Sequence, residues 1–516
     1  MKRFLLSIIL LIGYNLNAQD VVELKLPQSD KITIKVMFRN GSISDPAGKE
    51  GLTYLTVELM AQGGTKKYTA SQIKDIAYPM AAGYSVHTDK EVSTFTFSVH
   101  EDFLNRFYDD IIKGLLLEPA FSEDDFNRIK SNQLNYVEQV IKASSDEDYS
   151  KKILEDLLFR GTNYQHMTQG TAAGIKSITV ADVKKHYNNY FTRNNFTIGI
   201  AGNYKSEFVA KLKSDLNTLS AVNPTIPKPG AARVSNGIEV EIITKNNALG
   251  SAIFTGTPLL INRSHDDFAA MMVANSYFGE HRKSYSLLYQ KLREQRSMNY
   301  GSYSYIEWYE SGGGNMLPPP GVPRNSNYFS MWIRPVQTAS SLKGQYSELA
   351  DINIGHAHFA LRMAISELDK MISKGLSKED FELTREFLRS YIKLYAQTPE
   401  RQLGYLLDAR FYGRKDYLKE MDALLAKLTV DDVNRAIKKY LQKDNMFVSI
   451  ITHTSEAEPL KESLLKNTTS PVAYSNELKA VLTDEIFADD EKAAAYPLNV
   501  TSVKIIPSEE TFIIVP

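Results

Sequence analysis

Cysteine is absent from this chain of 516 residues. The protein can therefore form no disulfide, no thiolate metal site, no cysteine nucleophile and no lipid-anchored N-terminal cysteine. Net charge is also almost absent, at −1 from 60 basic and 61 acidic residues, so no overall attraction to nucleic acid is expected. Past the first residues no run approaches about 18 apolar residues, and we predict no membrane span in the mature chain.

The first 18 residues have the pattern of an export signal. Lys2 and Arg3 precede an apolar run over Phe4–Ile12, and Ala18 offers a small residue at a cleavage point. This order of basic, apolar and small residues is typical of a signal peptide. We expect residues 1–18 to be removed and the mature protein to be periplasmic or secreted. An uncleaved anchor is the alternative.

A duplicated unit organises the rest of the chain. Thr179 and Asp182 recur 250 positions later as Thr429 and Asp432, and Ser122–Phe126 is echoed 255 positions later by Ser377–Phe381. Blocks that recur in one order at nearly one offset predict two copies of a unit of roughly 220 residues.

Each copy has the pattern of an α+β domain. Residues 31–36 and 93–99 alternate apolar and polar side chains, which predicts half-buried strands. Residues 51–61 and 124–139 have helical spacing of apolar residues instead. We predict two homologous domains, each a mostly antiparallel sheet with helices packed on one face.

The predicted boundaries follow composition and the repeat. Ser220–Gly230 contains three prolines and marks the passage between the copies. The predicted segments are an N-terminal domain over 19–219, a linker over 220–234, a C-terminal domain over 235–465 and a tail over 466–516, which lacks the repeat pattern but has strand-like pieces such as 503–506.

Several short motifs resemble those of a known family. Asn40–Ser42, Gly51–Thr53, Gly63–Lys66 and Tyr187–Asn203 resemble the N-terminal unit of the pitrilysin/insulinase-type inverted-motif zinc peptidases. The resemblance extends over about residues 22–455 and implies the pitrilysin/LuxS-like metallohydrolase fold. Active members carry H-x-x-E-H on the first helix.

The zinc motif is missing here. The five motif positions run from Tyr54 to Glu58, with Val57 at the position of the base, and no histidine lies between Asn40 and Val86. Further along, where the family places a glutamate ligand, Asn132–Tyr136 contains no carboxylate. A zinc peptidase of this kind needs two imidazoles and a carboxylate base, so we expect no cofactor in this chain and predict that Glu58 is a surface carboxylate. Among the other histidines only His356 and His358 could chelate together, and a surface or cap role is the expectation for them.

The second copy keeps another part of the family's machinery. Arg293 and Tyr300, seven residues apart, resemble the arginine and tyrosine that contact the scissile region of the substrate opposite the zinc. A guanidinium and a phenol can hydrogen-bond a peptide carbonyl and the oxyanion formed on attack. Without the resemblance, a surface salt bridge and a strand-opening tyrosine would explain the same two residues.

The segment 311–324 combines Ser-Gly-Gly-Gly with a proline-rich stretch. Glycines next to polyproline suit a loop that is ordered against a partner or a ligand, and a solvent-exposed insertion is the alternative.

Together these observations predict a zinc-less subunit of an exported heterodimeric peptidase. It would supply Arg293 and Tyr300 in trans and half of a chamber, while a zinc-bearing partner of the same family cuts peptides or unfolded segments that bind as an added strand. The alternative is a non-enzymatic peptide-binding or envelope-assembly protein on the same scaffold.

Overall fold

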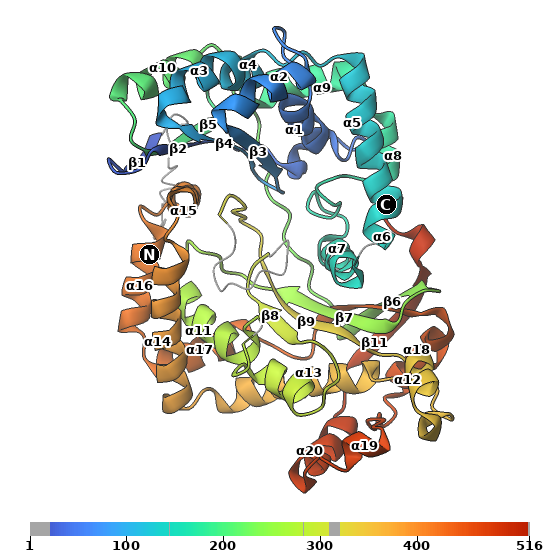
Figure 1. The fold of residues 1–516 in the computed structure, drawn as a ribbon. Coiled ribbons are helices and arrows are strands. Elements are labelled where there is room, and N and C mark those ends of the chain that lie inside the picture. The colour runs from blue at the N-terminus through green and yellow to red at the C-terminus, as the bar shows by residue number, and fades with distance from the viewer. Residues whose placement is uncertain (1–20, 144, 282, 309–319, 514–516) are drawn as a thin grey trace, which may run out of the picture.

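Two α/β halves of similar construction make up the protein. The computed structural model describes residues 21–143, 145–281, 283–308 and 320–513, so the predicted signal peptide lies outside the described residues. Figure 1 shows the N-terminal half above and the C-terminal half below, connected by an extended chain. None of the helices in these described ranges is both long and apolar enough to cross a membrane.

The N-terminal half is built on a five-stranded sheet in the order β1-β5-β2-β4-β3. β1 pairs with β5 in parallel, and the other neighbours are antiparallel. The strands are β1 (Val21–Lys25), β2 (Lys31–Phe38), β3 (Gly83–Thr88), β4 (Ser93–His100) and β5 (Phe196–Gly202). The helices are α1 (Leu52–Gln62), α2 (Ala70–Ala77), α3 (Leu104–Phe107), α4 (Lys113–Leu117), α5 (Glu123–Asn135), α6 (Ile141–Ala143), α7 (Asp146–Phe159), α8 (Ala172–Ser177), α9 (Val180–Tyr190) and α10 (Ser206–Leu216).

The C-terminal half is built on a six-stranded sheet in the order β11-β6-β10-β7-β9-β8. The strands are β6 (Ile238–Lys245), β7 (Gly250–Pro258), β8 (Ser302–Tyr305), β9 (Tyr328–Gln337), β10 (Met446–His453) and β11 (Val500–Pro507). The helices are α11 (Asp267–Gly279), α12 (Ala339–Gln345), α13 (Ala357–Lys374), α14 (Lys378–Tyr395), α15 (Pro399–Phe411), α16 (Tyr417–Lys427), α17 (Val430–Tyr440), α18 (Thr454–Lys466), α19 (Asn476–Lys479) and α20 (Asp484–Ala494).

The two halves are structural copies. Without β11 the second sheet repeats the strand order of the first. The repeated sequence blocks form matching helix caps: the Asp182 amide donates to the Thr179 hydroxyl at 3.2 Å, and the Asp432 amide to Thr429 at 3.2 Å. Each threonine and its aspartate form a capping box, which satisfies backbone donors at the helix start. The predicted duplicated α+β fold is confirmed.

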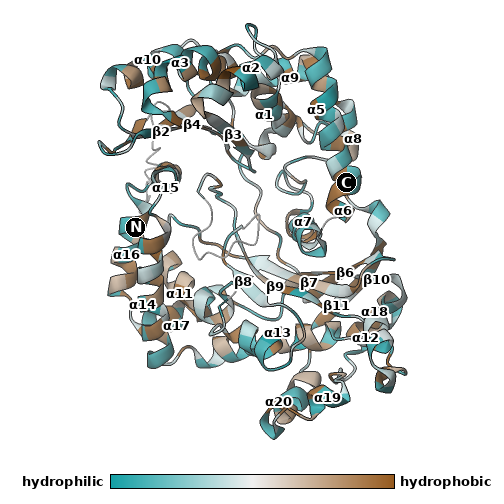
Figure 2. Cartoon of the chain, in the orientation of Figure 1, coloured by the Kyte–Doolittle hydropathy of each residue, from teal (hydrophilic) through white to brown (hydrophobic). Residues whose placement is uncertain are grey.

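Both faces of each sheet are buried. One face packs against helices of the same half, and the other against a helix of the other half. On one face of the first sheet the apolar residues of β2, Ile32, Ile34 and Val36, pack against helices of the same half such as α1. The second sheet packs in the same way against α11, α13 and α17. Figure 2 shows apolar residues along β6, β10 and β11 and a mostly hydrophilic α5 on the outside.

The second face of each sheet is covered by one helix from the other half of the chain. Leu403 and Leu407 of α15 pack on the first sheet, and a side chain at Gly199 of β5 would come within 3.0 Å of Leu407. In the corresponding place α7 packs on β7 and β10 of the second sheet, and a Cβ at Gly256 would lie 2.8 Å from Leu158. The prediction of helices on one face is therefore incomplete, because a sheet that is apolar on both faces must be covered on both.

Residues 466–516, predicted as a tail, take part in the fold. β11 extends the second sheet by pairing in parallel with β6. Beyond it, the Phe512 and Ile513 carbonyls accept hydrogen bonds from Ala172 at 3.2 Å and Ala173 at 3.1 Å, at the start of α8. The segment thus connects the second sheet with the first half.

Candidate functional site

The positions of the zinc motif lie on α1, whose start is fixed by a buried carboxylate. Asp45 accepts hydrogen bonds from the Gly51 amide at 2.6 Å and from the Thr53 amide at 2.7 Å, both in the first turn. His166 approaches the same carboxylate at 3.2 Å. A negative charge at a helix N-terminus binds the unsatisfied amides and complements the helix dipole.

The motif positions themselves present one carboxyl and no imidazole. Val57 is buried in the core of the first half. Tyr54 and Glu58 are half-buried one turn apart, and Gln62 donates a hydrogen bond to Glu58. Burial raises the pKa of Glu58, while the hydrogen bonds from Gln62 and Tyr54 and the charge of His87 on β3 oppose that rise. The sequence predicts a surface carboxylate for Glu58, and it lies at the surface only in part, because its side chain is half-buried on α1, which packs beside β3.

The stretch that replaces the glutamate ligand has a structural role. Gln133 of α5 is buried and donates hydrogen bonds to the Gly51 carbonyl at 2.9 Å and the Gln169 carbonyl at 2.7 Å. Asn135 is exposed. Gln133 therefore ties α5 to the start of α1. Among the residues that the structure describes, no group of three or more histidines and carboxylates could hold a metal ion.

His356 and His358 lie at the start of α13, and each side chain contacts a different polar group. His356 contacts the Ala473 carbonyl at 2.9 Å, and His358 contacts the Ser463 hydroxyl at 2.8 Å. Both are buried, and burial lowers the pKa of His358 to about 3. His356 occupies the N-cap position, as expected, but neither residue lies on the surface.

Arg293 and Tyr300 flank the turn that leads into β8. Arg293 belongs to a π-helical segment, η6 (Tyr289–Glu294). The segment ends with the Ser297 amide bonded to the Arg293 carbonyl at 2.9 Å and the Met298 amide bonded to the Leu292 carbonyl at 3.1 Å. Ser297 has a φ of 50°, so it occupies the left-handed position where helix ends usually place glycine.

The two side chains remain available. Arg293 is half-exposed and Tyr300 is 80% exposed. Within the described ranges neither side chain makes a hydrogen bond or an ion pair, whereas the neighbouring Arg296 is buried and ion-paired. The sequence singles out Arg293 by its spacing to Tyr300, and the fold adds that Arg293 is half-exposed while Arg296 is buried.

The end of the glycine- and proline-rich segment is part of the junction between the halves. Residues 309–319 lie outside the described residues. The Gly321 amide donates to both carboxylate oxygens of Asp408 at 3.1 Å. Asp408 is fully buried, and burial raises its pKa to about 6 although Arg263 lies 3.2 Å away.

Arg324 joins the halves through buried charges. Its Nε and one terminal nitrogen donate to Asp89, in the β3–β4 connection, at 2.6 and 2.5 Å. The other nitrogen donates to Glu155 of α7 at 2.5 Å, and Lys90 lies 3.2 Å from the same carboxylate. The guanidinium also lies over Trp308, 4.6 Å from the ring centre. This part of the 311–324 segment is therefore not a solvent-exposed insertion.

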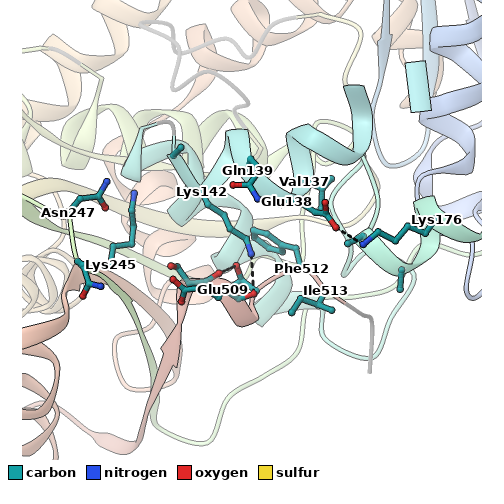
Figure 3. Close-up of a pocket in the computed structure, with 16 residues that line it drawn as sticks. Val137, Glu138, Gln139, Lys142, Lys176, Lys245, Asn247, Glu509, Phe512 and Ile513 are labelled. Carbon is teal, nitrogen blue, oxygen red and sulfur yellow. Dashed lines mark hydrogen bonds and ion pairs between the residues drawn. The ribbon is translucent and has the colours of Figure 1, made fainter. Parts of the chain in front are cut away.

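A groove of about 840 Å³ lies where the two halves meet the C-terminal segment (Figure 3). Its lysines are paired within the chain. The pairs are Lys142 with the Glu509 carbonyl at 3.3 Å, Lys176 with Glu138 at 2.6 Å and Lys245 with Asp146 at 2.5 Å. Of these contacts the one from Lys142 reaches the C-terminal segment, and Lys245–Asp146 joins β6 to α7; the three pairs identify no ligand.

Comparisons with known proteins agree with this picture. The model of the insulinase family (peptidase family M16) matches residues 20–172, and the model of the peptidase M16 inactive domain matches residues 177–388. An uncharacterised zinc protease of Streptomyces coelicolor is 23% identical over 429 residues, 82% of this chain and 85% of that protein. The uncharacterised zinc protease YmxG of Bacillus subtilis is 23% identical over 293 residues, 56% and 68% of the two chains.

Solved structures share the fold. A peptidase M16 inactive domain from Pseudomonas fluorescens superposes with a TM-score of 0.70 at 18% identity, over 85% of this chain and 96% of that one. The first half of the periplasmic protease PqqL from Escherichia coli superposes with a TM-score of 0.61 at 13% identity, over 93% and 95% of the two chains. With the two family models covering both halves in order, this chain belongs to the insulinase (M16) family of peptidases, as a member whose zinc-binding positions hold neither histidine nor glutamate in the required places.

Proposed function

We propose that this chain is the zinc-less subunit of an exported heterodimeric peptidase. The observation that carries this proposal is the contrast between the two halves. Tyr54, Val57 and Glu58 replace the metal-binding motif, while Arg293 is half-exposed, Tyr300 is exposed, and neither side chain has a partner among the described residues. The likeness to a protein named as a periplasmic protease supports export.

The chemistry of the two exposed groups fits a role opposite a metal. The zinc of a partner chain would supply a nucleophilic water for attack on a peptide carbonyl, whose oxygen would then gain negative charge. The Arg293 guanidinium and the Tyr300 hydroxyl can donate hydrogen bonds to that oxygen or to neighbouring carbonyls. Donors fixed where charge develops stabilise the transition state more than the bound substrate.

A peptide can bind to this chain as an added strand. β3 pairs with β4 and, in the ranges that the structure describes, with no strand on its other side. Gly83 and Ser85 of β3 are exposed. An open strand edge offers main-chain donors and acceptors, which gives affinity with little sequence specificity, as cleavage of unfolded segments requires.

The decisive experiment is reconstitution with a zinc-bearing chain of the same family that co-purifies from the native host. Arg293→Ala and Tyr300→Phe should each lower kcat per assembled pair by about 10²–10³-fold without lowering the yield of the pair. Arg106→Ala, at an arginine whose side chain is 56% exposed, is the matched control and should leave kcat unchanged.

Unchanged kcat in both variants would remove Arg293 and Tyr300 from the mechanism. If no zinc-bearing chain co-purifies and the isolated protein still binds unfolded peptides, the alternative of a non-enzymatic peptide-binding or envelope-assembly protein replaces the proposal. The open edge of β3 serves that alternative equally well.

A further inference from the structure

The C-terminal segment places two carboxylates against the helix that carries Arg293. Asp489 and Asp490 lie on α20, within the part of the chain that has no counterpart in the first copy. Asp490 accepts a hydrogen bond from Arg296 Nε at 2.7 Å. Asp489 accepts one from a terminal nitrogen of Arg296 at 2.9 Å and one from Lys291 Nζ at 2.9 Å.

The same guanidinium also fixes the backbone of η6. Arg296 donates from its second terminal nitrogen to the Lys291 carbonyl at 2.7 Å. One buried side chain therefore holds both α20 and the turn that contains Arg293. Leu292, next to Arg293, is fully buried. The backbone on both sides of Arg293 is thus anchored, while its side chain remains half-exposed.

The charges in this cluster depend on one another. The side chain of Arg296 is 0% exposed, so without its aspartates it would be a buried, unpaired cation, which is strongly unfavourable. Lys370 of α13 lies 3.6 Å from Asp489 and 2.6 Å from Glu367. Burial raises the pKa of Asp489, but the hydrogen bond from Lys291 and the nearby cations lower it below its usual value overall. Asp489 therefore stays ionised at neutral pH.

We propose that Asp489 and Asp490 are positioning residues for Arg293 and Tyr300. By holding Arg296 and Lys291 they fix the direction in which the turn presents the two exposed side chains to a bound peptide. This inference rests on the proposed function, and it gives the added C-terminal segment a role in the site of the second half. Neither aspartate touches the substrate.

Hydrogen exchange in the isolated chain tests the positioning directly. Asp490→Asn and Asp489→Asn are nearly isosteric and remove one charge each. We expect the amides of Gln295, Ser297 and Met298 to exchange at least about tenfold faster, with exchange in β6 and β10 unchanged. Asp484→Asn, in the exposed first turn of the same helix, is the matched control. Unchanged exchange at the three amides in both variants would overturn the inference.

A kinetic measurement on the reconstituted pair separates this inference from the proposed function. Asp490→Asn should lower kcat and leave KM nearly unchanged. It should cause little further loss when added to the double variant Arg293→Ala/Tyr300→Phe, because that variant already lacks both positioned groups. If Arg293→Ala has no effect on kcat, the proposed function fails while the exchange result still stands. If Arg293→Ala lowers kcat and Asp490→Asn does not, the positioning role is wrong.

Discussion

Replacing Arg324 by methionine should separate the unfolding of the two halves. The Arg324 side chain is 6% exposed and its partners Asp89 and Glu155 are 3% and 2% exposed. Removing one partner from a buried ion pair leaves a desolvated charge and costs about 3–5 kcal/mol. Lys90 remains beside Glu155 at 3.2 Å, so most of the loss falls on Asp89, whose pKa should rise once Arg324 no longer offsets its burial.

The two tryptophans of the chain provide the assay. Trp308 and Trp332 belong to the second half and lie against Lys152 and Lys151 of α7. Their fluorescence therefore reports on the second sheet and its cover by α7, whereas far-ultraviolet circular dichroism reports on the whole chain. In urea the two signals should change together in the native protein and at different midpoints in Arg324→Met. Arg106→Met, at an exposed arginine 3.7 Å from Asp110, should cost at most about 0.5 kcal/mol. Coincident transitions and a loss below about 1 kcal/mol in Arg324→Met would refute the reasoning.

Three further outcomes are expected. Metal analysis of the purified chain should find far less than one zinc per molecule, because Tyr54 and Val57 supply no ligand and no base; one tightly held zinc would contradict this. Burial lowers the pKa of His186 to about 4 from 6.5, so the unfolded chain binds more protons between these values and stability should fall by about 3 kcal/mol as pH drops through that window. In His186→Gln the urea midpoint of unfolding should depend less on pH in this window, and an unaltered dependence would contradict the expectation. Ser297→Gly should raise stability by about 1 kcal/mol, because glycine adopts positive φ without the penalty of a side chain; a lower melting temperature would disprove it.

Local signals in the sequence predicted the elements and their repetition. The Thr179–Asp182 and Thr429–Asp432 boxes are contacts between residues three apart, so their pattern is visible in the chain and their geometry follows from it. The alternation in residues 93–99 likewise predicts β4. The absence of the motif histidines could also be seen directly, since positions 54–58 contain none.

The sequence could not show the contacts between segments that are far apart along the chain. The exchange of α7 and α15 brings together residues far apart in the chain, such as Leu158 with Gly256 and Leu407 with Gly199. Periodicity reports only that a face is apolar, not which helix covers it. The half-buried environment of Glu58 depends on β3, and the burial of Arg324 depends on α7. The signals that could have pointed to the exchange are Gly199 and Gly256, which lie inside strands where a helix approaches closely.

The exchanged helices also set an order for folding during synthesis. The first sheet is complete once residue 202 has been made, but one of its faces stays bare until Pro399–Phe411 is available. The N-terminal half therefore cannot reach its final state as an independent unit while the chain is still being produced.

For the same reason, a cut in the segment 220–230 should not release two free domains. Each fragment would retain the helix that the other needs, so the two fragments should stay associated in the folded state. Expressed separately, either fragment would expose an apolar sheet face and depend on its counterpart, or on a chaperone, to remain in solution.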